Sequence, residues 1–175
     1  SSAIRRIRAD HPPFGTVYVD PPWMRASERS DAFEPDHGQT LSVEELARLP
    51  VGRLAAGDAH LHLLVPDELL FDCPRLLSAW GFAYQGVFVW TTPDAAPGGY
   101  WQVAHLCMVL GVRGRRSFDD QSVRSWAELR RGRPGGEADA VRSLLRRVSP
   151  GPHLDLFGRG AAAGCGWWRG RRRRS

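Results

Sequence analysis

A short strand that ends in an acid and two prolines constrains this chain more than any other feature. The β-branched and aromatic run over Gly15–Val19 predicts a buried strand. Asp20 follows it, and Pro21 and Pro22 then prevent both a continued strand and a helix that begins on the acid. Asp20 is therefore expected at the carboxyl end of a strand, where open α/β sheets bind their ligands.

Composition indicates one globular domain with a substantial core. The chain has 175 residues, 42% of them hydrophobic, and seven tryptophans, which argues against disorder. Its apolar runs are too short to cross a bilayer, and residues 1–10 are basic without the apolar core of a signal peptide. We expect a soluble, cytoplasmic protein that makes no contact with a membrane.

The net charge of +5 comes from the end of the chain. Of the 24 basic residues, five lie among the last seven positions, and without them the basic residues equal the 19 acidic ones in number. Residues 1–168 are therefore assigned to one domain and residues 169–175 to a basic, arginine-rich tail. We expect this tail to be a solvated cationic end, with contact to phosphate groups as the alternative.

Cysteine and histidine spacing does not indicate a metal site. Cys73, Cys107 and Cys165 are odd in number and far apart, which favours buried free thiols over disulfides or zinc ligation. His60 and His62 would share one face of a strand over Ala59–Val65, but no third ligand can be assigned. Both are predicted to be structural histidines, and no metal is expected.

Strands and helices are expected to alternate. Strands are predicted over Gly15–Val19, Ala59–Val65, Phe82–Trp90 and Leu154–Phe157. Helices are predicted from Leu41, with Ser42 and Glu45 as a capping box, over Asp67–Trp80 before the C-cap Gly81, and over Glu137–Val148. Together they predict a mostly parallel sheet with helices on both faces.

The segments between these elements are expected to be less regular. Met24–Thr40 is polar and is predicted to be a loop beside the candidate site. Thr91–Gly99 is predicted to be a Pro/Gly loop. Tyr100–Val112 allows a helix in its first half and predicts a buried strand over Cys107–Val112. Gly111–Gly132 is predicted to be a basic connector.

Several short motifs follow one another in an order that resembles a known family. The tetrapeptide Asp20-Pro21-Pro22-Trp23 is the first, and the others are Leu41–Leu46, Ala79–Phe82, Val87–Trp90, Gly99–Trp101, His105, Leu110–Gly114, Ser122–Ser125 and Pro150–Arg159. The series resembles the bacterial branch of the MT-A70 family of adenine-N6 methyltransferases, over about residues 14–159.

This resemblance implies an α/β, Rossmann-like methyltransferase fold with permuted motif order. The catalytic motif comes early and the strand beside the cofactor comes last. It implies an enzyme that uses S-adenosylmethionine to methylate the N6 amine of adenine in nucleic acid, with DNA favoured over RNA. A base in a duplex would have to be flipped out to react. The resemblance also allows a homo- or heterodimer.

Site residues are carried over from the resemblance by position. The catalytic residues would be Asp20, Pro21, Pro22 and Trp23, with the acid and the Pro21 carbonyl accepting hydrogen bonds from the amine and Trp23 stacking on the base. The cofactor-binding residues would be Phe157 and Arg159, and the substrate-binding residues would be His105 and Arg113. Asp10, in the loop before the first strand, is a further cofactor-binding candidate, with a solvated loop acid as the favoured alternative.

Two alternatives stay open because some pocket positions differ from the family pattern. Leu106 replaces an acid, Glu137 replaces a lysine, and Trp168–Arg171 replaces a polar motif that binds the cofactor ribose. These differences allow a catalytically impaired binding or scaffold subunit. The short chain has no separate target-recognition domain, which allows a methyltransferase for a small-molecule amine.

Overall fold

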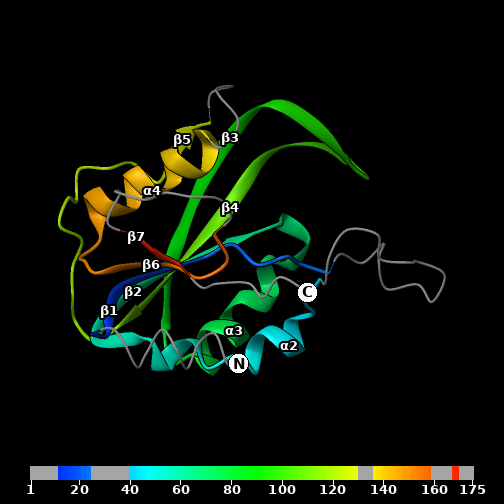
Figure 1. Cartoon of the computed structure of the whole chain (residues 1–175). Coiled ribbons are helices and arrows are strands. Elements are labelled where there is room, and N and C mark those ends of the chain that lie inside the picture. Colours follow the sequence, from blue (N-terminus) through cyan, green and yellow to red (C-terminus); the bar gives the residue numbers. More distant parts are fainter. Residues whose placement is uncertain (1–11, 25–39, 130–135, 159–166, 170–175) are drawn as a thin grey trace.

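A computed structural model describes residues 12–24, 40–129, 136–158 and 167–169 (Figure 1). Its sheet has seven strands in the order β5-β3-β4-β2-β1-β6-β7. The strands are β1 (Phe14–Val19), β2 (Ala55–Val65), β3 (Ala83–Gly98), β4 (Trp101–Arg113), β5 (Trp126–Glu128), β6 (His153–Asp155) and β7 (Trp167–Arg169). The α-helices within this part of the chain are α2 (Val43–Ala47), α3 (Cys73–Ala79) and α4 (Gly136–Val148).

The sheet is mixed and strongly curled, and the α/β class expected from the sequence is confirmed. β1 is parallel to both of its neighbours, β2 and β6, whereas β4 is antiparallel to β2 and β3. Helices α2 and α3 lie on one face, and α4 covers the other (Figure 1).

Strand β1 contributes to a core on each face of the sheet. Val17 and Val19 are fully buried in the core under α2 and α3, whereas Tyr18 points to the opposite core with Leu145 of α4. Burial on both faces explains why this strand is a continuous apolar run rather than an alternating one.

Local capping signals predicted from the sequence are confirmed. The Ser42 hydroxyl accepts the Glu45 backbone N–H, and the Glu45 carboxylate accepts the Ser42 N–H, forming the capping box of α2. Gly81 ends α3 with a φ of +76°, a conformation that disfavours side chains. The helix expected over Asp67–Trp80 is split, because a 3₁₀ segment, η3 (Asp67–Asp72), precedes α3. Pro74 has no N–H to extend the α-helical ladder backwards.

The loop predicted over Thr91–Gly99 is wrong, and so is the helical option for the first half of Tyr100–Val112. β3 continues to Gly98 and β4 begins at Trp101, so the two strands form one long hairpin. A register shift between Thr91 and Ala96 absorbs the proline-containing segment. The cross-strand partner, rather than local propensity, determines this structure.

Two short edge strands were not predicted. β5 lies within the segment expected to be a connector, and β7 pairs in parallel with β6 and ends at Arg169, a residue assigned to the tail. Residues 25–39 of the predicted loop, Cys165 and residues 170–175 lie outside the described residues. Within the described part, no helix is long and apolar enough to cross a membrane.

His60 and His62 are structural, as predicted. His60 Nε2 is 2.8 Å from the Arg116 carbonyl and must donate to it, so its Nδ1 accepts from the Ser149 hydroxyl at 2.9 Å. His62 Nε2 then donates to the same hydroxyl at 2.8 Å. Burial, with His60 and His153 nearby, lowers the pKa of His62 to about 3, so its ring is neutral. The hydrogen bonds to Ser149 join β2 to the end of α4.

Cys73 and Cys107 are buried free thiols, as predicted for these two residues. Burial raises the pKa of Cys73 to about 12 and also raises the pKa of Cys107. Both thiols therefore stay protonated and serve as small apolar groups in the core.

Candidate functional site

The chain connections diverge between β1 and β6, at the carboxyl ends of these two strands. These two strands are parallel neighbours, yet the chain continues from β1 to β2 on one side and from β6 to β7 on the other. This reversal is a topological switch point, where the connections diverge and leave a crevice between them. Asp20 follows β1 directly at this position.

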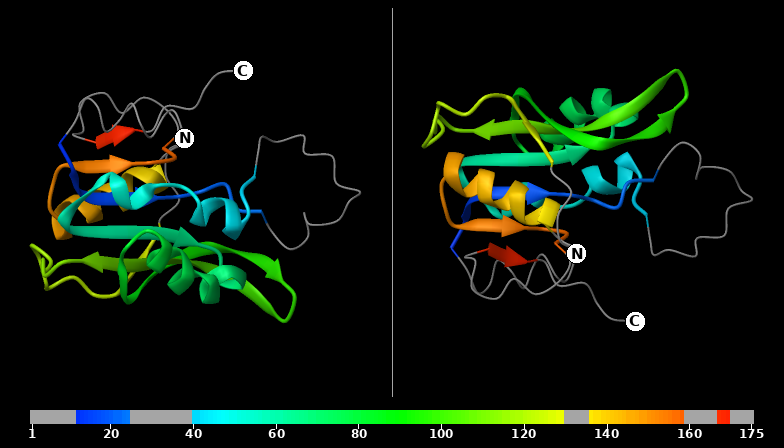
Figure 2. Two further views of the ribbon diagram at one scale, coloured as in Figure 1. Left: turned by 90° about the horizontal axis from the view of Figure 1, so that it is seen from below. Right: turned by 90° about the horizontal axis from the view of Figure 1, so that it is seen from above.

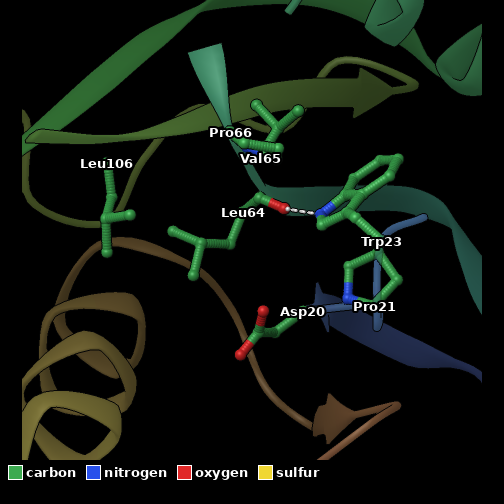
Figure 3. Close-up of a pocket in the computed structure, with 7 residues that line it drawn as sticks. All are labelled: Asp20, Pro21, Trp23, Leu64, Val65, Pro66 and Leu106. Carbon is green, nitrogen blue, oxygen red and sulfur yellow. Dashed lines mark hydrogen bonds between the residues drawn. The ribbon is translucent and has the colours of Figure 1, made fainter. Parts of the chain in front are cut away.

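A pocket of about 300 Å³ opens at this edge of the sheet (Figure 3). It is formed by the ends of β1 and β2 and by the middle of β4. Its lining residues are Asp20, Pro21, Trp23, Leu64, Val65, Pro66 and Leu106. Asp20 is the one ionisable side chain in this lining, so the pocket presents a single carboxylate between apolar walls.

The residues after Asp20 are held firmly across the ends of β1 and β2. The Pro22 carbonyl accepts the Leu41 N–H at 2.8 Å, and the Met24 N–H donates to the Leu41 carbonyl at 3.0 Å. The Trp23 indole N–H donates to the Leu64 carbonyl at 3.0 Å (Figure 3). Trp23 is thus a fixed, partly buried wall of the pocket, and its ring also contacts the core under α2 and α3.

The Asp20 carboxylate points into the pocket, on the side of Leu64 and away from Trp23 (Figure 3). Asp20 is classed as exposed, whereas Pro21 behind it is buried. The prolines restrict the backbone that carries the acid, so the Cα of Asp20 has a fixed position at the mouth of the pocket.

A buried polar group lies beneath Asp20. Tyr18 is 3% exposed, and burial, together with the charges of Asp20 and Asp155, raises the pKa of its phenol. Asp155 at the end of β6 is fully buried, and its Oδ2 accepts Arg142 Nε at 2.9 Å and Nη2 at 2.7 Å. Gly158 lies so close to this carboxylate that an added Cβ would clash with Oδ2.

The structure brings some of the predicted site residues together and separates others. The motif Asp20–Trp23 surrounds the pocket, and Phe157 follows β6 at the same edge of the sheet, where it packs partly buried against the core under α2 and α3. His105 lies one residue from the lining residue Leu106, and alternation along β4 points its side chain to the opposite face. Asp10 and Arg159 are outside the described residues.

Arg113 lies at the other edge of the sheet. β4 runs antiparallel to β2, so its last residue is at the amino end of the parallel strands. The guanidinium donates to the carbonyls of Gly81 at 3.0 Å, Gly52 at 2.7 Å and Trp80 at 2.5 Å, and it stacks over Phe82. Its contacts therefore join the C-terminal end of α3 to β4, and the structure does not bring Arg113 near Asp20.

Sequence reasoning missed the wall formed by β2 and the buried group beneath Asp20. Pro66 marks the end of a strand in the sequence, and pairing that strand in parallel with β1 would have placed Leu64 and Val65 beside Asp20. The contact between Arg142 and Asp155 has no such signal, because it joins a helix face to a strand end. Among the residues described, no three His, Cys, Asp or Glu side chains form a group suited to a metal ion.

Comparison with known proteins identifies no relative. No protein-family model matches the chain, and no curated protein matches it at a significant level of similarity.

Proposed function

We propose that this protein is an S-adenosylmethionine-dependent N-methyltransferase that acts on the N6 amine of adenine in nucleic acid, with DNA as the favoured polymer. The observation that carries the proposal is the Asp20 carboxylate at the carboxyl end of β1, followed by a Pro-Pro backbone, in a pocket of about 300 Å³ on the β2 side of the switch point between β1 and β6. A pocket of this size suits a single nucleobase, and its apolar walls suit a planar ring.

The chemistry of the amine explains the need for this acid. The N6 lone pair of adenine is delocalised into the ring, which makes the amine a poor nucleophile. A hydrogen bond from N6–H to the Asp20 carboxylate, and a second to the Pro21 carbonyl, localise that lone pair and direct it. When bound, S-adenosylmethionine would supply an electrophilic methyl group to N6 and leave as the thioether S-adenosylhomocysteine, and the proton lost from N6 would pass through the Asp20 carboxylate to solvent.

Asp155 on β6 and Trp167 on β7 carry polar groups that would suit a cofactor, whereas Trp90 lies on β3, farther along the sheet. Asp155 Oδ1 and the indole N–H groups of Trp90 and Trp167 are buried without a hydrogen-bond partner among the residues described. Buried polar atoms are rarely left unpaired, so a cofactor beside β6 would gain hydrogen bonds at Asp155 Oδ1 and Trp167 Nε1. β6 follows β1–β5 in the chain but lies beside β1 in the sheet, which agrees with a permuted, Rossmann-like methyltransferase.

Calorimetric titration with S-adenosylmethionine tests the cofactor assignment. The wild-type chain is expected to bind with a Kd below about 1 mM. Trp167→Phe, which removes one unpaired N–H and keeps the ring, is expected to weaken binding. Glu44→Gln, in an exposed ion pair on α2, is the matched control and should bind as wild type does. Absence of binding at about millimolar cofactor would contradict the assignment.

Leu106 favours a second candidate function. It places an aliphatic side chain opposite Asp20, so the pocket offers a base no second polar side chain there. The second candidate is therefore a binding or scaffold subunit, which would hold a base against the aliphatic Leu106 side chain without methylating it. Labelled-methyl transfer separates the two candidates, and free adenosine as acceptor tests a small-molecule amine as substrate.

A further inference from the structure

The β3–β4 hairpin ends in two exposed aromatic side chains. Tyr100 is 100% exposed and Trp101 is 80% exposed. The two rings are adjacent in the chain and so form a patch rather than scattered exposed residues, and burying such rings stabilises a complex strongly.

This hairpin extends past the edge of the sheet that holds the Asp20 pocket. β4 pairs with β2 from Cys107 onward, where Val65 is the last partner, so in the described part of the chain Trp101–Leu106 pairs with β3 alone. Two views at right angles to each other show the hairpin extending beyond the carboxyl end of β2 (Figures 1 and 2). Leu106, at the base of this extension, lines the pocket.

The tip holds its rings on a defined backbone. Gly98 pairs with Trp101, and Gly99 between them has a φ of +82° that favours glycine. An added Cβ on Gly98 would clash with Val103 Cγ2, so the turn requires a glycine at this close approach. The turn that carries Tyr100 and Trp101 therefore requires glycine at both Gly98 and Gly99.

We propose that Tyr100 and Trp101 form a stacking platform for an unpaired base in the nucleic-acid strand whose target adenine enters the Asp20 pocket. The inference rests on the proposed function, because that function places a base at Asp20. Leu106 lies five residue steps beyond Trp101 on β4, which is about 17 Å along a strand. Roughly five stacked nucleotides span this length, at about 3.4 Å each.

The composition of the tip favours a base over a protein surface. Pro93–Gly99 offers only short side chains and the single acid Asp94, so the two rings have no large apolar side chain from this segment beside them to build the core of a protein interface. Isolated flat faces suit unpaired bases, since every base has a face to stack.

Binding of a labelled single-stranded oligonucleotide of about 12 nucleotides, followed by fluorescence anisotropy, tests the platform. The full chain is used without cofactor, both as wild type and with Asp20→Asn, so that a failure of catalysis does not affect the result. The double variant Tyr100→Ala/Trp101→Ala should weaken binding by roughly 10-fold or more. Tyr84→Ala is the matched control, because Tyr84 is 53% exposed but lies at the start of β3, at the opposite edge.

Adenosine monophosphate gives an internal comparison, since it is too short to reach from the pocket to the tip. Its affinity should not change in the double variant. The proposal is overturned if the wild-type chain does not bind the oligonucleotide, or if the double variant binds it as tightly as wild type. It is also overturned if light scattering shows a dimer that the double variant dissociates while oligonucleotide binding stays the same, because the tip would then be a protein interface.

Discussion

Replacing Arg142 with methionine should destabilise the protein strongly. Arg142 is 6% exposed, and two of its nitrogens donate to Oδ2 of the fully buried Asp155. Arg142→Met keeps most of the side-chain volume but leaves a buried carboxylate without its counter-charge. Breaking a buried pair in this way costs about 3–5 kcal/mol. Denaturant unfolding followed by circular dichroism measures this loss directly.

Two further variants separate the charge effect from lost packing. Arg142→Met/Asp155→Leu removes both charges, so it should recover most of the stability that the single variant loses. Arg75→Met breaks the ion pair with Glu44, whose side chains are 61% and 52% exposed, and should cost at most about 1 kcal/mol. A loss below about 1 kcal/mol for Arg142→Met would refute the reasoning, because Asp155 would then have another way to compensate its charge.

Three other predictions concern the scaffold. Because burial depresses the pKa of His62 to about 3, the unfolded state binds more protons below about pH 6.5. Stability should therefore fall as the pH is lowered from about 6.5 towards 3, and His62→Gln should reduce this slope in urea titrations at several pH values. Gly81→Ala places a Cβ at a φ of +76° and 2.7 Å from Arg113 Nη2, so it should cost about 1 kcal/mol or more in the same assay. Peptide-mapped alkylation at pH 8 should leave Cys73 and Cys107 unmodified in the native protein and modify both in urea, and rapid native labelling would contradict their burial.

Elements with strong local signals could be predicted from the sequence. β1 ends where its prolines require it, and α2 begins at a capping box, because backbone chemistry within a few residues determines both. The buried apolar face of α4, which includes Val141, Leu145 and Val148, likewise follows from the 3.6-residue helical period. These predictions needed no knowledge of distant partners.

Elements that exist only through pairing could not be predicted. The far half of β3 contains prolines and glycines typical of a loop, and it is a strand because β4 lies beside it. β5 and β7 are too short to show a period and are defined by β3 and β6. In the candidate site, the position of Asp20 follows from its own sequence. The position of Arg113 depends on the direction of β4, which local sequence does not determine.

Methyl transfer tests the central claim most directly. The full chain is incubated with methyl-labelled S-adenosylmethionine and, in parallel, with DNA, RNA or adenosine, and the label is located by nucleoside analysis. We expect N6-methyladenine in DNA from the wild-type chain and from Glu44→Gln, and a loss of about 10²-fold or more for Asp20→Asn. No transfer to any acceptor by a chain that binds the cofactor, or equal transfer by Asp20→Asn, would contradict the account.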